Sequence, residues 1–227
     1  MVEGEKVTQK SVRFSGTGLE LEGILHLPAG EGSFPAVAVC HPHPLYGGDM
    51  HNNVVLAICH ALAEASIAAF RFNFRGVGKS EGDFAEGIGE QEDVVSALAF
   101  LASASKVDPS KIGLSGYSFG TQVALPVALR NEQVKAVALV SPFLSVSDWE
   151  QLKSYVKPKL FLCGDKDYLV SSQEVQQLTS GLPEPSQCEV IPGADHFWWG
   201  YEGEIAEKVS AFFRNAFTTM KESSAGL

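Results

Sequence analysis

The chain has few basic side chains, no cysteines at metal-binding spacing and no long apolar run. Lys and Arg total 17 against 27 Asp and Glu, so the formal net charge is −10, and the basic residues form no cluster. Nucleic acid and anionic membrane surfaces would repel such a chain, so we expect neither as a partner. No apolar stretch approaches the roughly 18 residues that a membrane-spanning helix needs.

The cysteines are isolated from one another, at positions Cys40, Cys59, Cys163 and Cys188. No two of them have C-x-x-C spacing, so we expect reduced thiols packed in a core rather than disulfides or a zinc site. The first residues lack the basic start and apolar run of a secretory signal, which makes the cytoplasm the expected compartment.

Apolar segments alternate with helical patterns along the chain. Residues 19–27 alternate apolar and polar side chains, as a half-exposed antiparallel strand does. Continuously apolar runs typical of parallel strands span 35–40, 67–72, 112–114, 136–140 and 160–163, and a last short strand is expected at 188–191. Helical patterns span 52–65, 89–105, 119–130, 172–180 and 202–219. This order predicts an α/β fold, with a mostly parallel twisted sheet of about seven or eight strands and helices on both faces.

The chain shows no internal repeat and no linker between domains. Its 227 residues fit one domain, which we expect to span 1–227, with flexible ends at 1–10 and 220–227. The segment 141–158, where related folds often insert a lid, is too short for a cap domain. We therefore expect an open, shallow site.

The pentapeptide Gly116-Tyr117-Ser118-Phe119-Gly120 has the pattern G-x-S-x-G. It stands between the predicted strand at 111–115 and the predicted helix that begins at Phe119. In that setting the pattern predicts a nucleophile elbow, in which the serine sits on a sharp turn and the glycines let neighbouring backbones pass. Ser118 is the predicted nucleophile.

A serine nucleophile needs a base and an acid that orients the base. The candidate base is His196, in a loop between the last predicted strand and the last helix. Two candidate acids, Asp165 and Asp167, follow the strand at 160–163, and Asp148 is a more distant third. Asp195 adjoins His196 and is interpreted as structural, because neighbours in an extended loop point apart. Serine, acid and base then follow in the chain order of α/β-hydrolases, at carboxyl ends of strands.

From about residue 19 to residue 217 the chain resembles an α/β-hydrolase. The segment His41-Pro42-His43-Pro44-Leu45-Tyr46-Gly47-Gly48-Asp49-Met50-His51-Asn52-Asn53 resembles a small lidless bacterial branch of that superfamily, marked by an HPHP…GG…N signature. Its members are mostly described as serine hydrolases or esterases. In the superfamily's G-D-x-D loop the second aspartate is usually the acid, and so the resemblance favours Asp167.

An oxyanion hole needs two backbone N–H groups. One is expected from Phe119, at the start of a helix. The resemblance implies the other at His43, two residues past the histidine that ends the strand, with Leu45 as the alternative if the register is shifted. Pro42 and Pro44 carry no N–H and would stiffen this loop.

Several aromatic and apolar residues are candidates for the substrate pocket. Trp198 and Trp199 follow the base directly; they either anchor the last helix or form a wall of the acyl pocket. The remaining candidates are Tyr46, Phe143 and Leu144.

Other histidines are close enough in sequence to suggest a metal site, but their spacing does not support one. A His-x-His unit between prolines offers no regular scaffold for a metal, so His41 is expected to brace its loop through backbone hydrogen bonds. His26 and His60 are expected on the surfaces of a strand and a helix. No metal site is predicted.

The segment Arg75-Gly76-Val77-Gly78-Lys79-Ser80 ends like a phosphate-binding loop. A Walker A motif needs glycine five residues before Gly78, where the chain has Asn73. The segment instead resembles the (D/N)-x-R-G-x-G-x-S loop of α/β-hydrolases.

Together these observations predict a serine hydrolase, carboxylesterase-like, that cleaves small carboxylic esters through an acyl-enzyme with a Ser-His-Asp triad. A site without a cap offers little surface for a long chain, which favours short-chain esters. No cofactor is expected, and the oligomeric state is not indicated. A thioesterase, a lactonase or an amide or peptide hydrolase on the same triad remains an alternative. A non-catalytic ligand-binding protein that kept the fold is a further one.

Overall fold

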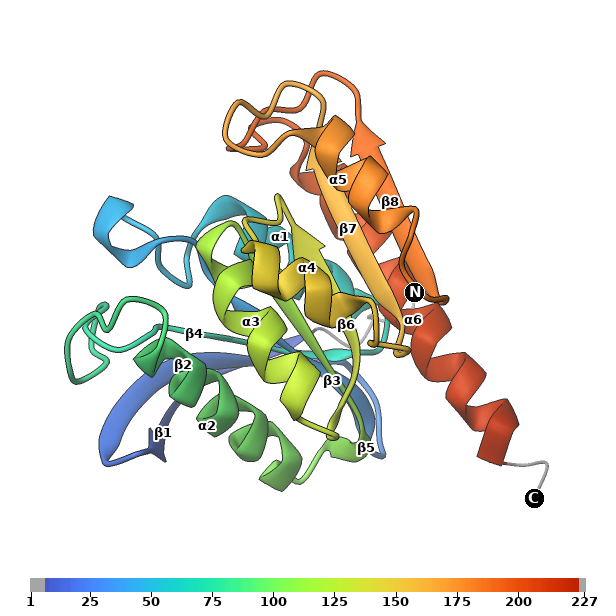
Figure 1. Cartoon of the computed structure of the whole chain (residues 1–227). Coiled ribbons are helices and arrows are strands. Elements are labelled where there is room, and N and C mark those ends of the chain that lie inside the picture. Colours follow the sequence, from blue (N-terminus) through green and yellow to red (C-terminus); the bar gives the residue numbers. More distant parts are fainter. Residues whose placement is uncertain (1–6, 225–227) are drawn as a thin grey trace.

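The computed structural model describes residues 7–224, which form a sheet of eight strands with helices on both faces (Figure 1). The strand order is β1-β2-β4-β3-β5-β6-β7-β8. β2 pairs antiparallel with β1 and β4, and all other neighbouring strands pair in parallel. The carboxyl ends of the parallel strands therefore meet at one edge of the sheet, where α/β folds place their sites.

The strands are β1 (Thr8–Gly16), β2 (Leu19–Leu27), β3 (Phe34–Cys40), β4 (Ala68–Phe72), β5 (Val107–Tyr117), β6 (Val134–Val140), β7 (Lys159–Gly164) and β8 (Ser186–Ile191). The helices are the 3-10 helix η1 (Pro44–Tyr46), then α1 (Asn53–Glu64), α2 (Gly89–Ser103), α3 (Phe119–Arg130), α4 (Val146–Leu152), α5 (Ser172–Thr179) and α6 (Glu202–Ser224).

Two apolar cores lie on opposite faces of the sheet. One face packs against α2, α3, α4 and α5, and the other against α1 and α6 (Figure 1). Strands between these layers are largely apolar, because both of their faces are covered; every residue of β4, for example, is buried, including Arg71. Among residues 7–224 no helix is both long and apolar enough to cross a membrane.

The predicted α/β architecture is confirmed, with three additions. β1, the edge strand, has a mostly exposed polar sequence and therefore gave no apolar pattern. α4 is only seven residues long and begins with a capping box between Ser145 and Asp148. η1 follows a proline and spans three residues.

The structure describes only part of the two ends that were expected to be flexible, residues 1–10 and 220–227. Residues 1–6 and 225–227 lie outside the described part of the chain. Thr8, Gln9 and Lys10 were expected to be flexible, but they pair with β2 as the start of β1, because the antiparallel partner supplies their backbone hydrogen bonds. The last helix, α6, continues to Ser224. The four cysteines are free thiols, and only Cys188 is not fully buried.

Candidate active site

Ser118 lies between β5 and α3 in a backbone conformation that side chains rarely adopt, with φ 54° and ψ −120°. The glycines on either side allow this turn. A Cβ at Gly116 would lie 2.4 Å from the carbonyl oxygen of Gly120, and a Cβ at Gly120 would lie 2.4 Å from the carbonyl oxygen of Cys40. Neither backbone could accommodate a side chain, so both glycines of the pentapeptide are required by close packing.

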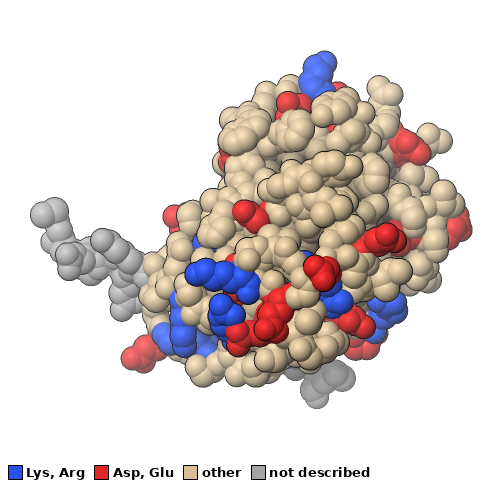
Figure 2. Space-filling model, turned by 90° about the vertical axis from the view of Figure 1, so that its left-hand side faces the viewer, with Lys and Arg blue, Asp and Glu red and all other residues tan. Residues whose placement is uncertain are grey.

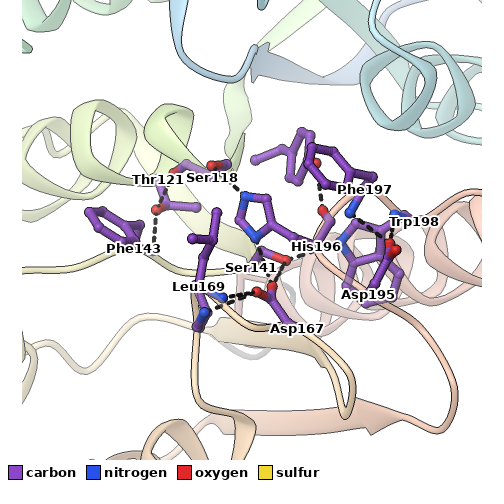
Figure 3. Close-up of polar contacts among 12 residues, drawn as sticks. Ser118, Thr121, Ser141, Phe143, Asp167, Leu169, Asp195, His196, Phe197 and Trp198 are labelled. Carbon is purple, nitrogen blue, oxygen red and sulfur yellow. Dashed lines mark hydrogen bonds and ion pairs between the residues drawn. The ribbon is translucent and has the colours of Figure 1, made fainter. Parts of the chain in front are cut away.

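Three side chains from distant parts of the chain form one hydrogen-bonded row (Figure 3). The Ser118 Oγ lies 2.9 Å from His196 Nε2, and His196 Nδ1 lies 2.8 Å from Asp167 Oδ2. Ser118 follows β5, Asp167 follows β7 and His196 follows β8, so the parallel sheet brings all three to its carboxyl edge. This is the geometry of a nucleophile, a base and an orienting acid.

The Asp167 carboxylate is buried and fully hydrogen-bonded. Its Oδ1 accepts the backbone N–H groups of Leu169 and Val170, each at 2.9 Å, and its Oδ2 accepts the hydroxyl of Ser141 at 2.8 Å as well as His196. Burial alone would raise the pKa of Asp167, but these hydrogen bonds and the charge on His196 together lower it. The carboxylate is therefore held ionised, as an acid that orients an imidazole must be.

A second layer of hydrogen bonds fixes the loops that carry His196 and Asp167. The Trp198 Nε1–H donates to Ser141 Oγ at 3.0 Å, and the Tyr117 hydroxyl donates to the carbonyl oxygen of His196 at 2.6 Å. Trp198 is completely buried. Ser141 and Tyr117 were not singled out from the sequence, although each stands at a position the motifs define: the first residue after an apolar strand, and the residue before the elbow serine.

The other aspartates have structural contacts instead. Asp165 Oδ1 accepts the N–H of Gly193 at 2.6 Å, which ties the acid loop to the base loop. Asp195 Oδ1 accepts the N–H groups of Phe197 at 2.9 Å and Trp198 at 3.1 Å. Asp148 caps α4. Of the candidate acids, the structure brings only Asp167 into contact with His196.

A cavity of about 670 Å³ opens beside Ser118. Its lining comprises Pro42, His43, Tyr46, Gly47, Gly48, Asn52, Tyr117, Ser118, Phe119, Gln122, Phe143, Leu169, His196 and Phe197. The volume falls in the range of about 300–1,000 Å³ that holds small organic ligands.

The loop after β3 approaches Ser118 through His43. The side chain of His43 packs against Phe119 with ring centroids 4.7 Å apart, and burial lowers its pKa, although the Glu90 carboxylate opposes this shift. Nothing among residues 7–224 accepts the backbone N–H of His43. By contrast, the N–H of Leu45 already donates to His43 Nδ1 at 3.2 Å. Phe119 begins α3, so its N–H has no partner within the helix.

The predicted pocket residues divide into two groups. Tyr46 and Phe143 line the cavity, as expected. Leu144 instead packs against the core and lines a separate cavity of about 150 Å³. Trp198 packs in the core under α6 and Trp199 is 71% exposed, so neither forms a wall of the cavity. Of the two roles considered for Trp198, the structure supports anchoring.

The cavity is completed by residues that the sequence did not indicate, chiefly Phe197, Leu169 and Gln122. Phe197 directly follows the base, and Leu169 lies two residues after Asp167, so their positions relative to the motifs offered a signal. Gln122 lies one turn into α3, where only the helix geometry places it toward the site.

The expectations for the histidines outside the cavity are confirmed for His41 and His60 and wrong for His26. His41 braces its loop as expected: its Nδ1 lies 2.7 Å from the carbonyl oxygen of Pro42, and its Nε2 accepts the N–H of Phe74 at 3.1 Å. The expectation that His26 lies on the surface was wrong. His26 is fully buried and accepts from Arg71 Nε at 2.9 Å, because β2 is covered by α1 at this position. His60 is exposed.

The RGVGKS segment is held by acidic residues. Arg75 pairs with the buried Asp93, and the N–H of Lys79 donates to Glu22 at 2.7 Å. Within the described part of the chain, no three His, Cys, Asp or Glu side chains are grouped so that they could hold a metal ion.

Several known proteins are similar to this chain over most of its length. The chain is 33% identical over 209 residues to an uncharacterized protein of Rickettsia prowazekii, covering 88% of this chain and 87% of the relative. An α/β serine hydrolase homologue from Coxiella burnetii is 33% identical with a TM-score of 0.80, covering 89% of this chain and 96% of that one. A lidless α/β serine hydrolase from Xanthomonas campestris is 26% identical with a TM-score of 0.76, covering 91% and 94%.

These relatives support a hydrolase with the lidless α/β-hydrolase fold. The model of the Dienelactone hydrolase family matches residues 75–222, which include the elbow, the acid loop and the base loop. The chain therefore belongs to the Dienelactone hydrolase family.

Proposed function

We propose that this hydrolase is a serine esterase that cleaves small carboxylic esters, with Ser118 as nucleophile, His196 as general base and acid, and Asp167 as the orienting acid. The observation that carries the proposal is the continuous row from Ser118 Oγ to His196 Nε2 at 2.9 Å and from His196 Nδ1 to Asp167 Oδ2 at 2.8 Å. A hydroxyl in this setting can lose its proton as it attacks a carbonyl carbon.

The reaction would proceed in two halves. In the first, Ser118 Oγ bonds to the ester carbon while His196 takes the hydroxyl proton, and His196 then passes that proton to the departing alkoxide, leaving an acyl-enzyme. In the second, His196 takes a proton from water, the hydroxide bonds to the acyl carbon, and the Ser118 oxygen leaves with that proton. Asp167 keeps the imidazole in the required tautomer and stabilises its positive charge in both halves.

The backbone N–H groups of Phe119 and His43 are the proposed oxyanion donors. Both residues line the cavity beside Ser118, and neither N–H has another acceptor among the described residues. Because Leu45 already donates to the ring of His43, its N–H is engaged elsewhere. Donors that are free and fixed in place stabilise the negative oxygen of the tetrahedral intermediate, at about 2.7–4 kcal/mol for each.

Labelling with a fluorophosphonate tests the proposal, because the probe bonds only to an activated serine. We expect labelling of the wild type and none of Ser118→Ala. The wild type should hydrolyse p-nitrophenyl acetate, and Ser118→Ala should not. An unlabelled wild type at neutral pH would contradict the proposal and favour a binding protein with this fold. A panel that adds an acyl thioester, a lactone and an anilide then ranks the acyl donors by kcat/KM.

A further inference from the structure

The cavity beside Ser118 has no fixed charge in its lining. Its polar side chains are amides, hydroxyls and imidazoles, and among the described residues none of the lining positions is Asp, Glu, Lys or Arg. A carboxylate or phosphate on a substrate would find no cation to pair with. Moving an unpaired anion out of water into such a site is costly.

Two acidic side chains, Glu90 and Asp167, stand behind the cavity wall. Glu90 is fully buried, accepts the N–H groups of Ala85 and Gly87, and lies close enough to influence His43. Asp167 lies directly behind His196. Both would repel an anionic group held beside Ser118, and part of this repulsion persists because buried charges are poorly screened by salt.

The rim of the cavity is apolar and aromatic. Tyr46 is 88% exposed, and Phe143, Leu169 and Phe197 are each about half exposed. On the face drawn in Figure 2, most of the Lys and Arg side chains in view lie in the lower part, mixed with Asp and Glu, below a broad surface that carries few charged side chains. Such a surface favours contact with apolar groups.

Resting on the proposed function, we infer that the substrates of this site are esters that are uncharged and apolar on both sides of the scissile bond. Anionic esters are disfavoured by the cavity itself. This selectivity comes from the absence of a pairing cation beside Ser118, combined with Glu90 and Asp167 behind the wall. A single lysine placed in the lining should therefore admit an anionic substrate.

The test uses two acetate esters that differ in charge and little in reactivity: methyl 4-acetoxybenzoate, which is neutral, and 4-acetoxybenzoate, which is anionic. Both carry a carboxyl-derived group para to the scissile oxygen. Dividing each kcat/KM by the rate of hydroxide hydrolysis of the same ester corrects for the remaining difference in intrinsic reactivity. We expect kcat/KM to be at least about tenfold higher for the neutral ester, a modest consequence of leaving one charge unpaired.

Two lysine variants locate the effect. Gln122→Lys places a cation in the cavity from α3, and Tyr46→Lys places one at its exposed rim. Both variants should lower the ratio of kcat/KM for the neutral ester to kcat/KM for the anionic ester, which is the gap between the two esters. Gln133→Lys makes the same charge change at an exposed position before β6, at the opposite edge of the sheet, and should leave the gap unchanged.

Equal kcat/KM for the two esters in the wild type would overturn the inference. It would also be overturned if Gln133→Lys narrowed the gap as much as the cavity variants did, because net charge rather than the lining would then be responsible. Fluorophosphonate labelling of every variant separates these failures from a failure of the proposed function. A protein that is labelled but does not discriminate charge is an esterase with a different selectivity.

Discussion

The indole N–H of Trp198 reaches the Asp167 carboxylate through one hydroxyl, that of Ser141. Trp198 Nε1 donates to Ser141 Oγ at 3.0 Å, and Ser141 Oγ donates to Asp167 Oδ2 at 2.8 Å. Trp198 and Ser141 both have positive φ angles, 61° and 45°, which are unfavourable for residues with a side chain. A strained backbone at both ends of one hydrogen bond is a feature of functional sites, and here the contact holds the hydroxyl that donates to the Asp167 carboxylate.

Ser141→Ala should lower kcat roughly tenfold with little change in KM, since a hydrogen bond to a charged group is worth about 1.5–3 kcal/mol. The loss also makes the Asp167 carboxylate easier to protonate, because the Ser141 hydroxyl is one of the groups that lower its pKa. The loss of activity that accompanies protonation of Asp167 at low pH should therefore begin at a higher pH than in the wild type. Steady-state kinetics with p-nitrophenyl acetate across pH measures both effects.

Trp198→Phe removes the indole N–H but keeps an aromatic ring in the core, and should shift the profile in the same direction by less. Trp199→Phe is the matched control, because Trp199 is exposed and does not line the cavity. A loss of activity at unchanged pH dependence would show that Ser141 and Trp198 only support the fold.

The two aspartates of the acid loop should differ sharply on replacement. Asp167→Asn should lower kcat by about 10⁴-fold, because an amide no longer holds the correct tautomer of the imidazole. Asp165→Asn should have a small effect, since its amide oxygen can still accept the N–H of Gly193. Single-turnover hydrolysis measures the difference. The opposite ranking would identify Asp165 as the acid.

The backbone of the elbow should make Ser118→Gly more stable than Ser118→Ala. At φ 54° and ψ −120° a side chain is strained by about 1–3 kcal/mol, and glycine relieves this. At ordinary positions the ranking is reversed, with glycine the less stable. Urea unfolding of the two inactive variants compares their free energies of unfolding. An equal or lower value for Ser118→Gly would mean that the turn carries no strain.

Features with a period or a fixed motif were predictable from the sequence. Apolar runs such as residues 35–40 and 136–140 predicted parallel strands, because burial on both faces leaves no room for polar residues. Ser118 and His196 followed from the motif and the strand that each residue succeeds, whereas the choice of Asp167 over Asp165 came from the resemblance to α/β-hydrolases. Most of the site was therefore predictable from the order of the strands along the chain, because residues that follow parallel strands meet at one edge of the sheet.

Contacts between side chains distant in sequence were not predictable. The sequence places His26 in a strand but contains nothing that says α1 covers it. Nor does it indicate that Leu144 packs against the core rather than lining the cavity beside Ser118. Ser141 depends on the rotamer of Trp198, 57 residues away. Such features are set by packing, and no local pattern records them.

Buried neutral histidines should make the protein less stable in mild acid. Burial lowers the pKa of His26 and of His41 to about 4, with Arg71 adding to the shift at His26. In the unfolded chain these groups take up protons near pH 6.5. The unfolded state therefore binds more protons between about pH 6.5 and pH 4, and the free energy of unfolding falls as pH is lowered through that window. For His41 the full loss is about 3 kcal/mol.

His26→Gln tests this directly, because its amide oxygen can still accept from Arg71 Nε while the side chain no longer titrates. The Nδ1 of His26 is buried without a partner, so little else is lost. Urea unfolding at pH 7.5 and pH 4.5 should show a smaller pH-dependent loss in His26→Gln than in the wild type, with the remainder due to His41. If the two proteins lose the same free energy over this interval, His26 is protonated as readily in the fold as in the unfolded chain, and its burial does not control its charge.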